Sequence, residues 1–270
     1  MRRMIFFDGG GDRLAATLDV ADGTTGLLIV SGGNEIRSGA HTGQAAIAQH
    51  LAKLGVLVFR YDRRGIGESE GENRGFESSA DDIASAVSAF RAEAPQMRHL
   101  VAFGNCDAAS ALAFFHDGLA IDALVLANPW VIEAADDDKP TAPTAAAIRA
   151  RYLARLKNPR SLIDLFTGKI DLKKLAGGLA KAAQKEAPTG LAARLADALA
   201  ATQIPVHILI ADRDTTAMAF MGVYKGTLFD PVRAKANVRL STTNSPSHSF
   251  ADAVSKDWLL QKLSDHFPAE

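Results

Sequence analysis

The chain has 270 residues, of which 47% are hydrophobic and 23% charged, and its formal net charge at pH 7 is −1. This composition is that of a globular protein with a substantial core, and the small net charge gives no basis for binding nucleic acid or an anionic membrane surface. Cys106 is the sole cysteine, which excludes an intrachain disulfide.

No targeting or membrane-spanning segment is predicted. The N-terminal segment turns polar after Phe7, too soon for the apolar region of a signal peptide. No apolar stretch elsewhere is long enough to cross a bilayer. We therefore expect a cytoplasmic protein.

Hydrophobic patterning in the first sixty residues predicts an α/β organisation. Residues 4–7 and 14–20, joined by a glycine-rich turn, are typical of an antiparallel hairpin. A buried strand at 27–30, an amphipathic helix at 44–54 and another strand at 56–61 follow. A strand, helix and strand at this spacing form a βαβ unit, which implies a parallel sheet.

A glycine-rich segment, residues 62–71, follows these elements. Its composition is compatible with a phosphate-binding loop, but no Gly-Lys-Ser or Gly-Lys-Thr follows it. The glycine spacing also fits neither the P-loop nor the dinucleotide fingerprint. We therefore expect no nucleotide at this loop, and we expect neither a metal nor another cofactor in this protein.

The most informative segment is Gly104-Asn105-Cys106-Asp107-Ala108. It lies between an apolar strand at 100–103, which follows a helix at 81–94, and a helical pattern that begins at residue 108. Small residues around one reactive side chain permit the sharp strand-to-helix turn that exposes a nucleophile. The alternative is that this cysteine is a buried small hydrophobe, as most free cysteines are.

After a further strand at 123–127 the alternation of strands and helices stops. Residues 131–203 show only helical patterns, with an acidic turn and several prolines, and a strand pattern returns at 204–210. We expect a helical cap over the carboxyl edge of the sheet, where open α/β sheets bind ligands. The alternative is a helical decoration that never meets substrate. The core domain would comprise residues 1–130 and 204–270, and the cap 131–203.

The C-terminal part supplies a candidate acid and a candidate base. Asp212 and Asp214 both follow the strand at 204–210, and either could instead pair with Arg213 or cap a helix. His248 lies in a turn-rich loop between the last strand, 238–241, and the final helix, 251–266. The order nucleophile, acid, histidine is that of the α/β-hydrolases. We therefore expect Cys106, an aspartate and His248 to form a catalytic triad.

Three motifs carry a resemblance to the α/β-hydrolase superfamily that extends from about Leu14 to the C-terminus. They are Gly32-Gly33 with Arg37-Ser-Gly-Ala-His41, then Asp62-Arg-Arg-Gly-Ile-Gly-Glu-Ser69, and Cys106-Asp-Ala-Ala-Ser110. The second occurs throughout the superfamily as a largely structural turn. The first and third resemble the hydrolases associated with the exosortase A system of exopolysaccharide-producing Gram-negative bacteria. The resemblance implies an α/β-hydrolase fold, with a mostly parallel, doubly wound sheet, an inserted cap and a cysteine nucleophile.

The resemblance also implies roles for particular residues. Related hydrolases commonly carry Gly-x-x-Asp after the acid strand, and with Ala211 in the glycine's place the matching position is Asp214. The oxyanion hole would be formed by the N–H of Asp107 and one N–H of the 31–34 loop, either Gly33 or Asn34. The sequence departs from the superfamily pattern in having Cys for Ser at 106, Ala for Gly at 108, and Ser31 where His-Gly often stands.

These parts predict a chemistry. The helix N-terminus and His248 would both favour the thiolate form of Cys106, whose attack on an ester or thioester gives an acyl-thioenzyme. An acyltransferase with the same nucleophile is the alternative, and a non-catalytic binding protein is a third hypothesis. Arg37 and His41 are candidates for binding a substrate carboxylate or phosphate, although Arg37 could equally pin its own loop to an acidic neighbour.

Overall fold

The computed structural model describes residues 1–133 and 190–267, and a single eight-stranded sheet runs through this part of the chain. The strand order is β1-β2-β4-β3-β5-β6-β7-β8. The strands are β1 (Arg2–Asp8), β2 (Arg13–Asp19), β3 (Thr25–Val30), β4 (Leu57–Tyr61), β5 (His99–Asn105), β6 (Ala123–Ala127), β7 (Val206–Ala211) and β8 (Val238–Thr243). β2 is antiparallel to its neighbours β1 and β4, whereas the six strands from β4 to β8 are mutually parallel. The predicted hairpin and the predicted mostly parallel, doubly wound sheet are confirmed.

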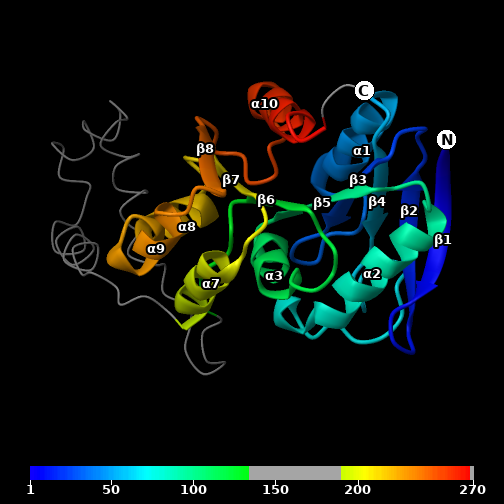
Figure 1. Cartoon of the computed structure of the whole chain (residues 1–270), viewed down its shortest axis with the longest axis horizontal. Coiled ribbons are helices and arrows are strands. Elements are labelled where there is room, and N and C mark those ends of the chain that lie inside the picture. The colour runs from blue at the N-terminus through cyan, green and yellow to red at the C-terminus, as the bar shows by residue number, and fades with distance from the viewer. Residues whose placement is uncertain (134–189, 268–270) are drawn as a thin grey trace, which may run out of the picture.

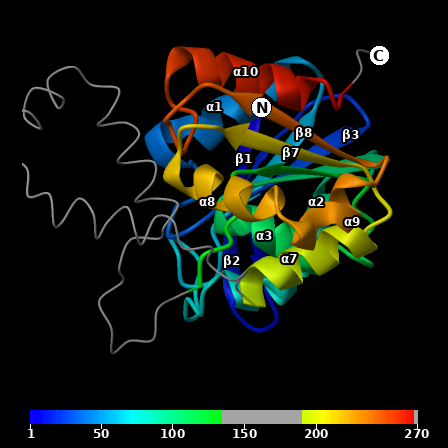
Figure 2. The same ribbon diagram turned by 90° about the vertical axis from the view of Figure 1, so that its left-hand side faces the viewer.

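Helices cover both faces of this sheet (Figure 1). One face carries α1 (Gly43–Lys53) and α10 (Ala253–Ser264). The other carries α2 (Ala80–Glu93), α3 (Asp107–Phe115), α7 (Gly190–Ala201), α8 (Thr215–Tyr224) and the short α9 (Asp230–Arg233). The turned view in Figure 2 shows the same three layers, with α10 and α1 on one side of the sheet and α3 and α7 on the other.

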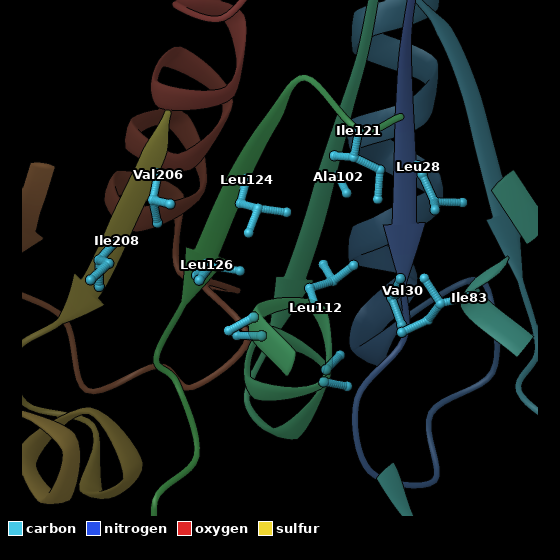
Figure 3. Packing of buried hydrophobic residues seen from close by; sticks show 14 of the residues in the cluster. Leu28, Val30, Ile83, Ala102, Leu112, Ile121, Leu124, Leu126, Val206 and Ile208 are labelled. Atoms are coloured by element: carbon cyan, nitrogen blue, oxygen red, sulfur yellow. The ribbon is translucent and has the colours of Figure 1, made fainter. Parts of the chain in front are cut away.

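The central strands are buried on both faces, and alternate residues enter two separate clusters. Figure 3 shows one of them, in which strand residues such as Leu28, Leu124 and Ile208 pack with Ile83 of α2 and Leu112 of α3. The opposite cluster contains the intervening strand residues and the apolar sides of α1 and α10. Burial on two faces is why these strands read in the sequence as continuous apolar runs.

The predicted cap, residues 131–203, falls mostly outside the described residues, since 134–189 are not among them. Its described end is α7, which packs beside α3. Leu195 and Leu199 of α7 are 0% exposed and belong to the same apolar cluster as α3. This helix therefore belongs to a helical layer of the core fold. For residues 134–189, the cap stays a prediction.

Two helices were not predicted from the sequence. Residues 215–224 are mostly apolar around the whole helix, so α8 gives no period of 3.6, and α9 has only four residues. Within the described residues, no helix is both long and apolar enough to cross a membrane.

Candidate active site

The three residues predicted to form a triad follow strands that end at one edge of the sheet. Cys106 follows β5, Asp214 follows β7 and His248 follows β8, and these strands lie in the continuous order β5-β6-β7-β8. Because parallel strands end at the same edge, three residues far apart in the sequence converge there.

Cys106 occupies a tight turn between β5 and α3. Its backbone has φ 65° and ψ −128°, which is unusual for a residue with a side chain, and α3 begins at the next residue. Gly104 makes the turn possible, because a Cβ atom there would lie 2.7 Å from the Ala108 carbonyl carbon. The predicted strand-to-helix turn is therefore present, with Cys106 between the end of β5 and the start of α3.

His248 contacts one of the two candidate aspartates. Its Nδ1 lies 2.9 Å from Oδ2 of Asp214, whose side chain is 6% exposed. The same carboxylate oxygen accepts the Ala217 N–H at 3.0 Å and so caps α8, which fixes its position. Asp212 is exposed, and its N–H donates to the Thr243 carbonyl as the chain leaves the sheet.

The charge state of His248 follows from these neighbours. Hydrogen bonds with Asp214 and with Cys106, together with the negative charges of both, raise the pKa of His248 to about 10, although burial acts in the opposite direction. The imidazolium is therefore the stable form near neutral pH.

The 31–34 loop lies directly against the turn that carries Cys106. A Cβ atom on Gly32 would lie 2.5 Å from the Asn105 carbonyl oxygen and 3.5 Å from the Cys106 Cβ. The Gly33 N–H donates to Oδ1 of Asp107 at 2.7 Å, and Arg63 donates to the Gly33 carbonyl. The loop predicted to supply an oxyanion-hole donor thus lies beside Cys106, and its Gly33 N–H is bonded to a carboxylate.

Arg63 contacts both the 31–34 loop and Asp107. Its Nη2 lies 3.7 Å from the other oxygen of Asp107, and its side chain is 5% exposed. Asn34, the other candidate donor, has its side-chain oxygen bonded to Asn73 at 3.0 Å. A buried cation therefore holds both the loop and the first residue of α3.

Arg37 and His41 occupy different environments. The Arg37 guanidinium contacts Asp62, Glu68 and the Thr17 hydroxyl, and its side chain is 13% exposed. These contacts favour the interpretation in which Arg37 pins its loop. His41 is exposed and has a left-handed backbone, with φ 51°.

Two asparagines that were not predicted as site residues also lie at this edge. Asn105 precedes Cys106, and Asn128 follows β6; both donate side-chain N–H groups to the His248 carbonyl, at 3.1 and 3.2 Å. In the sequence, each asparagine is a polar residue at the end of an apolar strand, and this pattern could have identified both. Among the described residues, no group of three or more His, Cys, Asp or Glu side chains could hold a metal ion.

Comparisons with known proteins agree with this architecture. A family model described as serine aminopeptidase, S33, matches residues 26–219, whereas no curated protein matches the chain. An esterase from Pyrococcus furiosus superposes with a TM-score of 0.66 at 14% identity, covering 98% of this chain and 89% of its own. A hydrolase from Pseudomonas aeruginosa gives 0.60 at 20% identity, covering 99% of each chain. A proline iminopeptidase from Mycobacterium smegmatis gives 0.58 at 15% identity, covering 98% of each. At such identities the solved structures share the fold of this chain.

Proposed function

The chain belongs to the serine aminopeptidase S33 family and has the α/β-hydrolase fold, and from this premise we propose that it hydrolyses esters or thioesters with Cys106 as its nucleophile. The family is named for a serine, and a cysteine stands at the strand-to-helix turn here. The observation that carries the proposal is the contact of His248 with both Cys106 and the buried Asp214.

The proposed reaction has two stages. The Cys106 thiolate forms a bond to the carbonyl carbon of the substrate, and the tetrahedral intermediate then expels the alcohol or thiol, which takes a proton from Nε2 of His248. A water molecule attacks the resulting acyl-thioenzyme and gives a proton back to His248. The acid leaves, and the thiolate and imidazolium are restored. Asp214 holds the ring throughout by its hydrogen bond to Nδ1.

The oxyanion would be bound by backbone N–H groups. The Asp107 N–H lies in the first turn of α3 and so lacks an intrahelical acceptor. The second donor is the N–H of either Gly33 or Asn34. The Gly33 N–H would have to break its hydrogen bond to the Asp107 carboxylate, or divide it between the carboxylate and the substrate oxygen. Each well-placed donor of this kind contributes roughly 10²–10³ to kcat in acyl-transfer enzymes.

Finer aspects of the function are also proposals. The cysteine supports acyl transfer as an alternative, because a thioester intermediate readily passes its acyl group to an amine, alcohol or thiol. The motif resemblance to exosortase A system-associated hydrolases supports the cysteine nucleophile and supplies no substrate. A cap formed by residues 134–189 would limit substrate size.

Intact-mass measurement tests the nucleophile. The chain is incubated with p-nitrophenyl esters and acyl-CoAs of increasing length and quenched in acid. We expect an acyl adduct on Cys106, none in Cys106→Ala, and weak turnover at most in Cys106→Ser, because an alcohol is far less acidic than a thiol. Faster turnover on adding amines or alcohols would identify the acyltransferase. Full esterase activity in Cys106→Ala would contradict the proposal.

A further inference from the structure

Asn128 joins the three strand ends that carry Cys106, Asp214 and His248. Its side-chain oxygen accepts the Ala211 N–H at 2.9 Å, at the end of the strand before Asp214. Its Nδ2 donates to Oδ1 of Asn105 at 3.2 Å and to the His248 carbonyl at 3.2 Å. One side chain therefore contacts the residue before the nucleophile, the acid strand and the backbone of the base.

The backbone around Asn128 strengthens the same connection. The Asn128 N–H donates to Leu209 of β7 at 2.9 Å, and the Cys106 N–H donates to the Ala127 carbonyl at 2.9 Å. Asn128 is 0% exposed and has φ 42°, a left-handed conformation that asparagine tolerates better than most residues. Asn128 is thus held by backbone hydrogen bonds between β7, which precedes Asp214, and the turn that follows β5 and carries Cys106.

Only a primary amide satisfies all of these partners. The Ala211 N–H needs an acceptor, while Asn105 Oδ1 and the His248 carbonyl both need a donor. An amide supplies one oxygen and two N–H groups, so its capacity to donate is fully used. An ionised carboxylate at this position would face two oxygens without a proton to give. An aliphatic side chain would remove the partner of the Ala211 N–H and of Asn105 Oδ1, and would leave the His248 carbonyl with Asn105 as its side-chain donor.

His248 needs such support because its ring has few contacts within the described part of the chain. Its side chain is 37% exposed, and among the described residues the ring is bonded only to Asp214 and Cys106. The loop carrying it is fixed at the carbonyl of the same residue by two amides, those of Asn105 and Asn128. Asn105 is adjacent to Cys106, so the hydrogen bond from Asn105 to the His248 carbonyl helps to fix the separation between His248 and Cys106.

We propose that Asn128, acting with Asn105, is a positioning residue that holds the His248 loop in register with the nucleophile turn and the acid strand. The inference rests on the proposed function, since it assigns Asn128 to the same Cys106–His248 pair. A displacement of about 1 Å in such a pair can cost on the order of 10²-fold in rate, so the loss of this support has a measurable consequence.

The test is the rate of Cys106 alkylation by iodoacetamide as a function of pH, which requires no substrate. Asn128→Gly removes the amide and keeps the left-handed backbone without a Cβ penalty. We expect alkylation near neutral pH to slow by roughly 10- to 100-fold, because a thiolate that loses its imidazolium neighbour forms only at higher pH. Asn105→Ala should slow it in the same direction, and it replaces the first variant should that one not fold.

Asn237→Ala is the matched control. The Asn237 side chain also bonds two carbonyls, those of Thr202 and Ile204, but at the opposite edge of the sheet. We expect this variant to have a lower Tm and an unchanged alkylation profile. For an identified ester substrate, Asn128→Gly should lower kcat and leave KM unchanged.

The outcomes separate the two proposals. If the native protein already alkylates with the pH profile of an ordinary thiol, and His248→Ala changes nothing, the proposed Cys106–His248 chemistry is wrong. If the native profile is that of an ion pair but folded Asn128→Gly and Asn105→Ala both retain it, the chemistry stands and the positioning role is overturned.

Discussion

At the scale of single residues, the sulfur at position 106 determines what is required of the surrounding groups. A serine hydroxyl needs a neutral imidazole to take its proton, whereas a thiolate needs a cation beside it. The contacts of His248 with Asp214 and Cys106 raise its pKa to about 10, which suits the second requirement. In the proposed mechanism, Cys106, His248 and Asp214 therefore carry charges that differ from those of a resting serine triad.

Replacing Asp214 tests this division of charge. Asp214→Asn keeps an oxygen to cap α8 but removes the charge, so the pKa of His248 falls and the imidazolium is lost at a lower pH. We expect the alkaline limb of the pH–rate profile to shift to lower pH. Turnover should fall by less than the roughly 10⁴-fold seen for the matching change in a serine triad. Asp212→Asn is the control, and greater damage from it than from Asp214→Asn, in a folded protein, would refute the assignment.

Local sequence identifies some site residues and leaves others unresolved, for a physical reason. Cys106 is recognisable because its small neighbours and its place between strand and helix are local features. The choice between the two roles of Arg37 was open, because its partners Asp62 and Glu68 lie in another motif and become neighbours only after folding. Asn128 was missed because three of its side-chain partners come from three other segments.

At the scale of elements, the close packing of α3 on β5 defines the site. Predicted and observed strands agree well here, because strands buried on both faces are continuous apolar runs in any sequence. The helices α8 and α9 were missed because one lacks an amphipathic period and the other is a single turn. The sequence does not show that α3 approaches β5 so closely that only hydrogen fits at Gly104.

Gly104→Ala tests this packing. The new methyl group would lie 2.7–2.9 Å from backbone atoms of Ala108 and Ala109, so α3 must shift along with the Asp107 N–H. We expect a loss of roughly 1–3 kcal/mol in the free energy of unfolding, as for other overpacked cores, and a large loss of activity. Urea titration and an esterase assay measure the two effects.

Gly222→Ala is the matched control, since Gly222 is an exposed residue of α8. Among the described residues, a methyl group added there would meet no atom within 4 Å outside the backbone of its own helix. Here the same substitution should stabilise the protein by roughly 0.5–1 kcal/mol, because alanine loses less backbone entropy in a helix. A neutral result at Gly104 beside a gain at Gly222 would show that α3 does not need its close approach.

At the scale of the whole molecule, two histidines link the sheet to the end of the chain. His207 of β7 is buried, and its ring nitrogens lie 3.2 Å from His266 Nε2 and 2.9 Å from the Ser241 hydroxyl. Burial, assisted by the charge of Arg239, lowers the pKa of His207 to about 3 and that of His266 to about 4. Both rings are therefore neutral in the folded protein at the pH where they would be charged in the unfolded chain.

This difference predicts acid sensitivity. Between pH 6.5, the unfolded value, and about 3 the unfolded chain binds more protons, so stability is complete above that window and falls as the pH falls through it. His207 alone contributes a slope of up to about 1.4 kcal/mol per pH unit. His207→Leu should flatten the dependence of the unfolding free energy on pH, while His50→Gln, an exposed position of α1, should not. An equally steep profile in both variants would contradict this account.

The backbone of Cys106 has a consequence for how this sequence can change. A residue with a side chain at φ 65° and ψ −128° costs on the order of 1–3 kcal/mol, which glycine would not. We expect Cys106→Gly, which has no nucleophile, to resist urea better than both the native chain and Cys106→Ala. Mutation followed by selection for thermal stability alone would therefore discard the thiol, and only selection for turnover retains it. At position 106, the residue that gives the greatest stability and the residue that supplies the nucleophile are therefore different.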